Sequence, residues 1–300
     1  MTVGRTASPA SWPTSTEMPR YFAYGSNLDL EDLARWAQRA GCGPPDLRFE
    51  ARAWLPDHAL RFHYRSPARG GGALDVTPRL GAAVSGALFV TGGFELLDRK
   101  EGVAEGRYER FRCRVIREDG ALAQAVSYRV RAAHRRPHHV PPTEAYLATV
   151  RRGMRRWGLS EEGLERAARD SSAVSWPSQI FVYGTLMRGH CRAAVMEQAG
   201  PRGVLPATVR GRLVDLGAYP GLVPGEGLVH GELWRYDDVA SLLAELDAIE
   251  DFEGYQRLPE SLYVRTIVAV DVDGVPAAAW TYLWQGPAAP SVPAGRWTGA

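Results

Sequence analysis

The strongest constraint on the fold is that the same short landmark occurs twice, once in each half of the chain. An apolar run ending in Tyr-Gly is found at residues 21–28 (YFAYGSNL) and again at residues 181–187 (FVYGTLM). A Leu-Asp-x-x-Glu segment follows each run, ending at Glu101 in the first half and at Glu250 in the second. Landmarks repeated in the same order indicate a duplicated structural unit.

A third landmark, a hairpin pattern, follows each of these glutamates. Residues 108–130 and 263–284 alternate apolar and polar side chains, and each stretch contains an Asp-Gly pair, Asp119-Gly120 or Asp273-Gly274. Asp-Gly supplies the positive φ that a tight hairpin needs. Each half therefore reads as strand, Tyr-Gly turn, helix, several strands, a short helix ending in Glu, and a hairpin. This order favours an α+β fold with a small closed or strongly curved mixed sheet, and it does not decide between a barrel and an open sheet.

Length and composition favour two domains. The chain has 300 residues, of which 45% are hydrophobic and 23% charged, as is typical of a soluble globular protein. The predicted division is a disordered tail at 1–19, domain 1 at 20–170, a linker at 171–178, domain 2 at 179–286 and a tail at 287–300. The pattern also predicts helices over 143–158 and 160–170, strands over 208–215 and 228–236, and a loop rich in Gly and Pro at 221–227.

Charge and cysteine content exclude several classes of function. The formal net charge is only +2, and basic residues alternate with acidic ones, so we expect no nucleic-acid partner. The three cysteines, Cys42, Cys113 and Cys191, are odd in number and lack metal-ligand spacing, which predicts free thiols in a reducing cytoplasm. We find no apolar run long enough to span a bilayer, and therefore expect a cytoplasmic chain without a membrane partner.

The Tyr-Gly turn is the first candidate for chemistry. Gly25 lets the backbone turn sharply, and unpaired amides at the start of a helix form a cradle for an anion the size of a carboxylate. The alternative is that Ser26 or Asn27 only caps the helix. Recurrence of the turn as Tyr183-Gly184-Thr185 favours the cradle.

The two glutamates are the second candidate. Glu101 and Glu250 each end a predicted helix just before a loop, where a carboxylate can face a pocket. A single such Glu is usually a solvated surface charge, but the repetition at matching positions favours a role in general acid/base catalysis. The chain has no Gly-x-Ser-x-Gly motif, and Cys113 lies in a strand pattern, so covalent catalysis is not expected.

These residues resemble the γ-glutamylcyclotransferase superfamily. The first half is similar to the glutathione-cycle type of γ-glutamylcyclotransferase through residues 21–28, Gly71-Gly72-Ala73 and 97–103 (LDRKEGV). The second half is similar to γ-glutamylamine cyclotransferases and plant avirulence-induced proteins through residues 181–187, 219–227 and 246–251. The resemblance implies two small mixed β-barrels with flanking helices, a small-molecule γ-glutamyl substrate and no cofactor or metal, and it allows the two domains to pack on each other.

The resemblance also implies roles for individual residues. Glu101 and Glu250 would be the catalytic acid/base residues, and Tyr108 and Tyr263 would help to wall the two pockets. The remaining substrate-binding residues would be Tyr21, Phe22, Ala23, Tyr24, Gly25 and Ser26 in the first half, and Tyr183, Gly184, Thr185 and Leu186 in the second.

The implied reaction needs no nucleophile from the protein. The α-amine of the substrate attacks its own γ-carbonyl and closes a five-membered ring, releasing 5-oxoproline and a free amine or amino acid. Two alternatives stay open: removal of a γ-glutamyl protecting group from a secondary metabolite, and a non-catalytic γ-glutamyl-binding or scaffold protein with one or both halves inactive. The tandem arrangement and the loop at 252–261, longer than its counterpart at 102–107, depart from the family pattern. The longer loop could reshape the second pocket for a bulkier amine or mark that half as inactive.

Overall fold

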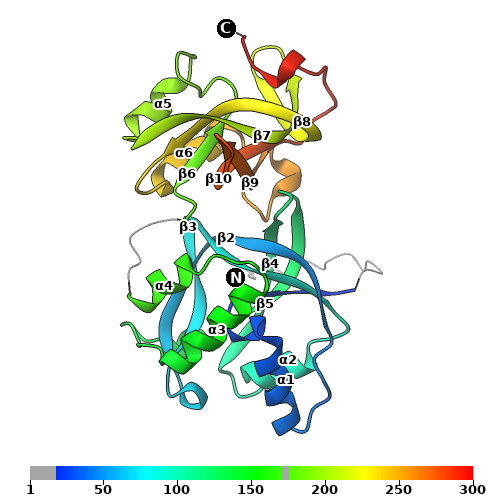
Figure 1. The fold of residues 1–300 in the computed structure, drawn as a ribbon, viewed down its shortest axis with the longest axis vertical. Helices are drawn as coiled ribbons and strands as arrows, with labels where there is room; N and C mark the ends of the chain where they lie inside the picture. Colours follow the sequence, from blue (N-terminus) through cyan, green and yellow to red (C-terminus); the bar gives the residue numbers. More distant parts are fainter. Residues whose placement is uncertain (1–17, 171–175, 300) are drawn as a thin grey trace, which may run out of the picture.

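The computed structural model describes residues 18–170 and 176–299, which form two closed mixed barrels arranged along the long axis of the molecule (Figure 1). The predicted α+β class with two small mixed barrels is confirmed, and closure of both sheets decides the question that the sequence left open. Most of the predicted tail 1–19 and much of the predicted linker 171–178 lie outside the described residues.

The two barrels share one strand order. Barrel 1 runs β1–β3–β2–β4–β5 and barrel 2 runs β6–β8–β7–β9–β10, and in each the first strand lies parallel to the last and closes the sheet. The elements of barrel 1 are β1 (Arg20–Ala23), α1 (Leu30–Arg39), β2 (Leu47–Ser66), β3 (Gly71–Thr91), α2 (Glu95–Glu101), β4 (Tyr108–Arg117), β5 (Leu122–Val130), α3 (Glu144–Arg156) and α4 (Glu162–Ala168). Those of barrel 2 are β6 (Gln179–Val182), α5 (Ala193–Gln198), β7 (Gly203–Asp215), β8 (Pro220–Arg235), α6 (Ala240–Ile249), β9 (Tyr263–Val272) and β10 (Val275–Trp284).

Both predicted hairpins are present. Strands β4 and β5 turn around Gly120, and β9 and β10 turn at Asp273 and Gly274, whose φ angles are 52° and 82°. Two successive positive φ values are typical of the turn that fits the right-handed twist of a hairpin.

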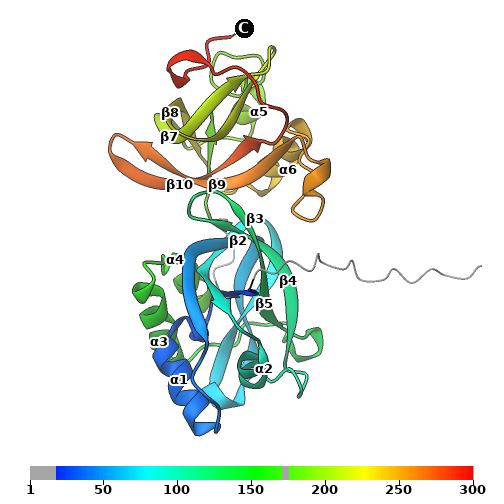
Figure 2. The same cartoon turned by 90° about the vertical axis from the view of Figure 1, so that its right-hand side faces the viewer.

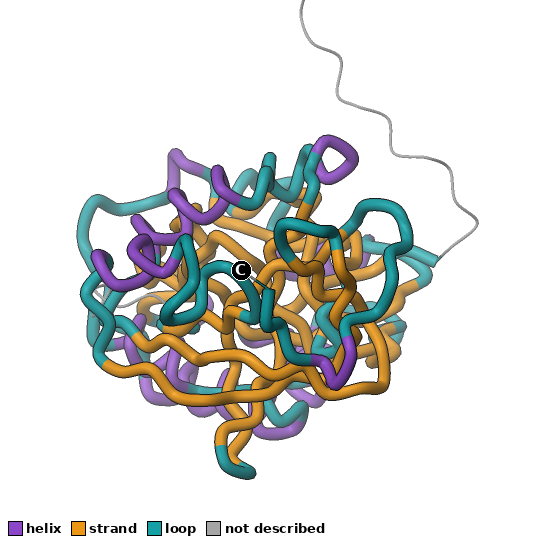
Figure 3. Tube along the Cα trace, turned by 90° about the horizontal axis from the view of Figure 1, so that it is seen from above, coloured by secondary structure: helices purple, strands orange, loops and turns teal. Residues whose placement is uncertain are grey.

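Helices flank the barrels, as Figures 2 and 3 show. The two helices predicted before the linker are α3 and the shorter α4, and Thr143 caps α3 by accepting a hydrogen bond from the amide of Tyr146 at 3.3 Å. Over the ranges 18–170 and 176–299, no helix combines the length and apolar character needed to cross a membrane.

The prediction of a Gly- and Pro-rich loop at 221–227 is wrong. These residues lie inside β8, and the turn between β7 and β8 falls at 216–219 instead. The pairing of β7 with β8 shifts register between Arg210 and Arg212, where a Cβ on Gly227 would come within 3.0 Å of the carbonyl oxygen of Gly211. The glycines therefore allow close approach of two backbones at a bulge, which a sequence pattern reads as a loop.

The segment after β10, predicted as a tail at 287–300, packs on barrel 2 as far as Trp297. The amide of Val292 donates a hydrogen bond of 2.8 Å to the carbonyl oxygen of Leu213, and Trp297 is buried in the apolar cluster of this barrel.

A glycine at the same place in each barrel lets the first strand lie close to its neighbour. A Cβ on Gly86 would stand 2.3 Å from the carbonyl oxygen of Ala23, and a Cβ on Gly231 would stand 2.1 Å from that of Val182. We expect Gly86→Ala to lower the free energy of unfolding by about 2 to 3 kcal/mol, because the strands must separate to admit the methyl group. Urea unfolding measures this change. The control is Gly203→Ala, where nothing lies within 4 Å, and an equal loss in both variants would contradict the packing argument.

Candidate functional site

Barrel 1 contains a cavity of about 230 Å³ beside the Tyr-Gly turn, which we call cavity 1. Six of the predicted residues line it: Tyr21, Tyr24, Gly25, Ser26, Glu101 and Tyr108. Phe22 and Ala23 lie outside it and are fully buried in the barrel core, where both pack against the Gly86 backbone.

The Tyr-Gly turn leads into a short 3-10 turn (Ser26–Leu28) before α1 begins. The cap of α1 is Asp29, whose carboxylate accepts hydrogen bonds from the amides of Glu31 and Asp32, both at 3.1 Å. The alternative that Ser26 or Asn27 caps this helix is therefore wrong.

Because Asp29 caps the helix, the turn itself is free for another role. Its backbone hydrogen bonds are donated by the amides of Leu28 and Asp29. Among the described residues no backbone acceptor is recorded for the amides of Gly25 and Ser26, and both residues line cavity 1. The side chain of Asn27 is turned to Glu101 and donates to its Oε1 at 2.8 Å and to the hydroxyl of Tyr21 at 2.9 Å.

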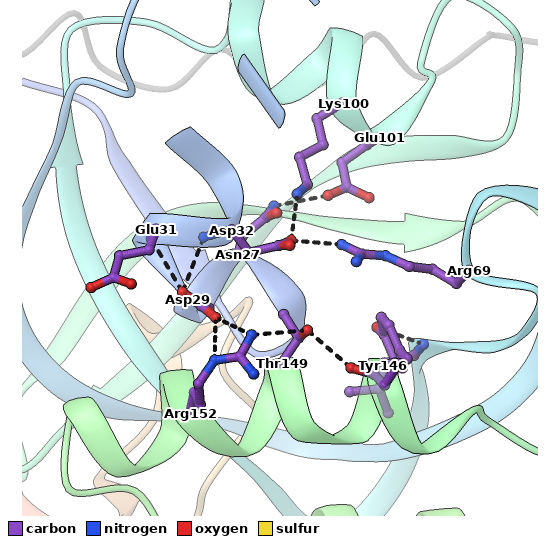
Figure 4. Close-up of polar contacts among 12 residues, drawn as sticks. Asn27, Asp29, Glu31, Asp32, Arg69, Lys100, Glu101, Tyr146, Thr149 and Arg152 are labelled. Carbon is purple, nitrogen blue, oxygen red and sulfur yellow. Dashed lines mark hydrogen bonds and ion pairs between the residues drawn. The ribbon is translucent and has the colours of Figure 1, made fainter. Parts of the chain in front are cut away.

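Glu101 lies at the end of α2 in a cluster of charged side chains (Figure 4). Lys100 Nζ lies 3.6 Å from Asp32 Oδ2 and is buried without a hydrogen-bond partner among the described residues. Arg69 donates a 2.9 Å hydrogen bond to the same oxygen of Asp32. Burial raises the pKa of Glu101, and this rise is opposed by the Lys100 ammonium and by the hydrogen bond from Asn27. A carboxylate with a raised pKa is suited to accept and return a proton.

Barrel 2 contains a smaller cavity of about 130 Å³, cavity 2, at the equivalent place. All the residues predicted for the second half line it: Tyr183, Gly184, Thr185, Leu186, Glu250 and Tyr263. Glu250 follows the last residue of α6, as the Leu-Asp-x-x-Glu pattern predicts. Burial raises the pKa of Glu250 to about 7, against the opposing effect of the Arg192 guanidinium.

The two cavities are built on the same hydrogen bonds to the barrel. The hydroxyl of Tyr24 donates to the carbonyl oxygen of Tyr128 at 2.7 Å, and that of Tyr183 donates to Tyr282 at 2.7 Å. These bonds connect each Tyr-Gly turn to the last strand of its barrel. The repeated Tyr-Gly landmark therefore corresponds to a repeated hydrogen bond in the structure.

The aspartate of each Leu-Asp-x-x-Glu segment anchors the helix that carries the glutamate. Tyr128 donates to Asp98 Oδ1 at 2.7 Å, and Tyr282 donates to Asp247 Oδ1 at 2.7 Å. Arg110 on β4 and Arg265 on β9 form ion pairs with the same two carboxylates. The aspartate therefore has a positional role, and the glutamate one turn later faces the cavity.

The surroundings of the two glutamates differ. Leu186 takes the place in the second turn that Asn27 has in the first, and Ile249 precedes Glu250 as Lys100 precedes Glu101. Cavity 2 thus has no counterpart of Lys100 or of Asn27, two of the side chains that favour the ionised form of Glu101.

Sequence reasoning did not assign several residues that line the cavities. Tyr146 on α3 lines cavity 1, and its hydroxyl accepts a hydrogen bond from the amide of Leu74. The sequence signal that could have identified Lys100 as a lining residue is its position next to Glu101. Other lining residues left unassigned are Tyr64, Arg69, Arg107, Arg192 and Tyr219.

Comparison with known proteins finds two family models in tandem. A model described as gamma-glutamyl cyclotransferase, AIG2-like, matches residues 180–299, and a model of the AIG2-like family matches residues 84–166. A solved structure titled gamma-glutamyl cyclotransferase shares 28% identity with a TM-score of 0.43, covering 50% of this chain and 86% of its own.

Two curated relatives carry the same family name. A putative gamma-glutamylcyclotransferase of Vibrio cholerae is 42% identical over 72 residues, 24% of this chain and 61% of the relative. The gamma-glutamylcyclotransferase family protein YtfP of Escherichia coli K12 is 36% identical over 109 residues, which is 36% of this chain and 84% of the relative. With that coverage at that identity, and with the tandem barrels that its sequence predicted, the chain belongs to the γ-glutamylcyclotransferase family.

Proposed function

We propose that the protein releases 5-oxoproline and a free amine or amino acid from γ-glutamyl amides in at least one of its two cavities. The observation that carries this proposal is the shared constellation, in which a Tyr-Gly turn and a partly buried glutamate line the same small cavity. Family membership supports cyclotransferase activity in general.

In the proposed mechanism, the protein orients the substrate and carries protons from the attacking nitrogen to the departing one. The amides of the Tyr-Gly turn hold the substrate carboxylate and carbonyl oxygen, which brings the α-nitrogen within reach of the γ-carbonyl carbon. The glutamate takes a proton from the α-ammonium, the new C–N bond closes the ring, and the original C–N bond breaks. That proton passes to the departing nitrogen as its bond breaks, and the second proton that the ring nitrogen must lose follows the same route, so the amine leaves as its ammonium ion and the glutamate is regenerated without a covalent intermediate.

The charges around the cavities support different leaving groups. Cavity 1 is lined by four cations, Arg39, Arg69, Lys100 and Arg107, against the two carboxylates of Asp32 and Glu101. Cavity 2 is lined by Arg192 against Glu250 and Asp251. Cavity 1 therefore suits a leaving group that carries a carboxylate, and cavity 2 suits a neutral or cationic amine.

The experiment that tests the function is mass spectrometry of the products formed from a panel of γ-glutamyl amino acids and γ-glutamyl amines. We expect 5-oxoproline and the free amine in equal amounts. The matched control is the same amide with an N-acetylated α-amine, which cannot attack and must remain intact. Release of glutamate in place of 5-oxoproline would point to hydrolysis, and binding of the panel without turnover would favour the non-catalytic alternative.

The pH dependence of the two cavities should differ. In Glu101→Gln only cavity 2 can work, and kcat/KM is expected to rise with pH through about 7, because Glu250 must be ionised to accept a proton. In Glu250→Gln the rise is expected at lower pH, because Lys100 and Asn27 oppose the increase in the pKa of Glu101. Initial rates between about pH 5 and 9 measure both profiles, and identical profiles would contradict this difference.

A further inference from the structure

Arg265 of barrel 2 lies in a buried site that barrel 1 completes. Its side chain is only 1% exposed, and Nη1 donates to Asp247 Oδ2 at 2.7 Å. Nη2 forms an ion pair with Asp57, which lies on β2 of barrel 1. The guanidinium also lies over the rings of Phe252 and Trp280, with its carbon 5.2 Å from each centroid. A buried guanidinium is stable only when carboxylates and rings replace its water, and one of its two carboxylates comes from the other domain.

The equivalent arginine of barrel 1 has no such site. Arg110 pairs with Asp98 as Arg265 pairs with Asp247, but its side chain is 42% exposed. The repeat therefore carries the same ion pair twice, and only the copy in barrel 2 is enclosed. The ion pair between this arginine and the helix aspartate is common to both barrels. The second ion pair, with Asp57, and the burial of Arg265 are specific to the tandem arrangement.

A further contact from barrel 1 reaches the loop that follows Glu250. Arg114 Nη1 donates to the carbonyl oxygen of Tyr255 at 2.5 Å, and the Tyr255 hydroxyl donates to the carbonyl oxygen of Arg265 at 3.0 Å. Tyr255 belongs to the loop at 252–261 that is longer than its counterpart in domain 1. The loop that departs from the family pattern is thus held against the other barrel.

The start of α6 is also in contact with barrel 1. Asp57 Oδ1 accepts a hydrogen bond of 3.0 Å from the amide of Gly81, and a Cβ on Gly81 would lie 3.1 Å from the Cα of Ala240, the first residue of α6. One corner of barrel 1, formed by Asp57 and Gly81, therefore touches α6 near its start and, through Arg265, near its end.

We propose that Asp57 is a positioning residue for cavity 2, so that domain 1 serves as the built-in partner that fixes the acid/base group of domain 2. Asp57 holds Arg265, Arg265 holds Asp247, and Asp247 lies one helical turn before Glu250. The Tyr-Gly turn that binds the substrate in the proposed function bonds to none of these three side chains; Tyr183 is held by the backbone carbonyl of Tyr282. Loss of the Asp57 carboxylate should therefore displace Glu250 while leaving the other wall of the cavity in place.

The test is Asp57→Asn in two backgrounds of the full chain. In Glu101→Gln, which leaves only cavity 2, we expect kcat to fall about ten- to hundredfold with KM nearly unchanged, as a small displacement of a reacting group does. In Glu250→Gln, which leaves only cavity 1, the same substitution should change kcat less than twofold. Assays are run well below the unfolding transition, with the folded fraction checked by tryptophan fluorescence. The control is Arg79→Gln, which removes a more peripheral ion pair across the same interface, 3.9 Å from Asp238.

Hydrogen exchange makes this inference separable from the proposed function on which it rests. We expect amides at 246–262 to exchange faster in Asp57→Asn than in the wild type or Arg79→Gln, whether or not any substrate is turned over. If no 5-oxoproline forms but the amides at 246–262 exchange faster in Asp57→Asn, the proposed function is refuted and the positioning role of Asp57 stands. Unchanged exchange there, or an unchanged kcat in an active cavity 2, would overturn the inference.

Discussion

The double variant Glu101→Gln, Glu250→Gln is expected to lose 5-oxoproline formation by about two to four orders of magnitude, the usual contribution of a general acid/base group. Glutamine keeps the size of the side chain and its hydrogen-bonding capacity, but it cannot accept the proton of the α-ammonium. Product formation is measured by mass spectrometry with each member of the substrate panel. The two single variants then assign the activity to one cavity or both.

The Glu250→Gln substitution also offers an internal control on folding. The pKa of Glu250 is about 7 in the folded chain against an ordinary 4.5, so its neutral form favours folding and that contribution is lost as pH rises through 7. At pH 8 the ionised wild-type side chain lowers stability by roughly 3 kcal/mol, since each pKa unit corresponds to about 1.4 kcal/mol. Glu250→Gln should thus be more stable than the wild type near pH 8 and equal to it near pH 4.

These two results together make the test decisive. A double variant that is folded, at least as stable at pH 8 and inactive identifies the glutamates as the proton-transfer groups. An undiminished rate in a folded double variant would place the base elsewhere and refute the assignment. The gain in stability also explains why a buried carboxylate at this position signals a function, because it is costly to the fold.

The sequence predicted those parts of the molecule that local patterns determine. The Asp-Gly hairpins, the Leu-Asp-x-x-Glu helices and the two Tyr-Gly turns each depend on a few neighbouring residues, and their repetition made the duplicated unit predictable. The wrong prediction at 221–227 has the opposite cause. Its glycines serve a strand bulge, which depends on the pairing with β7 and leaves no local signal.

The site was predicted less completely because the surroundings of its glutamates depend on long-range contacts. Asn27 reaches Glu101 across 74 positions, and Arg265 reaches Asp57 across 208. No spacing rule connects residues so far apart. Aligning the two turns matches Asn27 with Leu186, but the sequence does not show that Asn27 contacts Glu101, so it hides the asymmetry between the halves.

Lys100 is the residue expected to decide which leaving group cavity 1 accepts. Its ammonium lines the cavity, is buried, and has no hydrogen-bond partner among residues 18–170 and 176–299, while the nearest carboxylate oxygen, on Asp32, is 3.6 Å away. A buried donor without a partner is costly unless a ligand completes it. Ile249 occupies the matching position beside Glu250, so cavity 2 offers no such donor.

Lys100→Ile, made in the Glu250→Gln background, should lower kcat/KM for γ-glutamyl amino acids about ten- to hundredfold, the range expected for a hydrogen bond to a charged group. The value of kcat/KM for γ-glutamyl amines should change little. The quantity to compare is therefore the ratio of kcat/KM for γ-glutamyl amino acids to kcat/KM for γ-glutamyl amines. The pH profile should also move upward, because the Lys100 ammonium lowers the pKa of Glu101. The control is Arg99→Ile, which removes the same charge one residue earlier on α2, where Arg99 contacts Cys42 Sγ at 3.1 Å. Equal losses for both substrate classes, or an equal effect of Arg99→Ile, would show that Lys100 acts through net charge or folding and not through the leaving group.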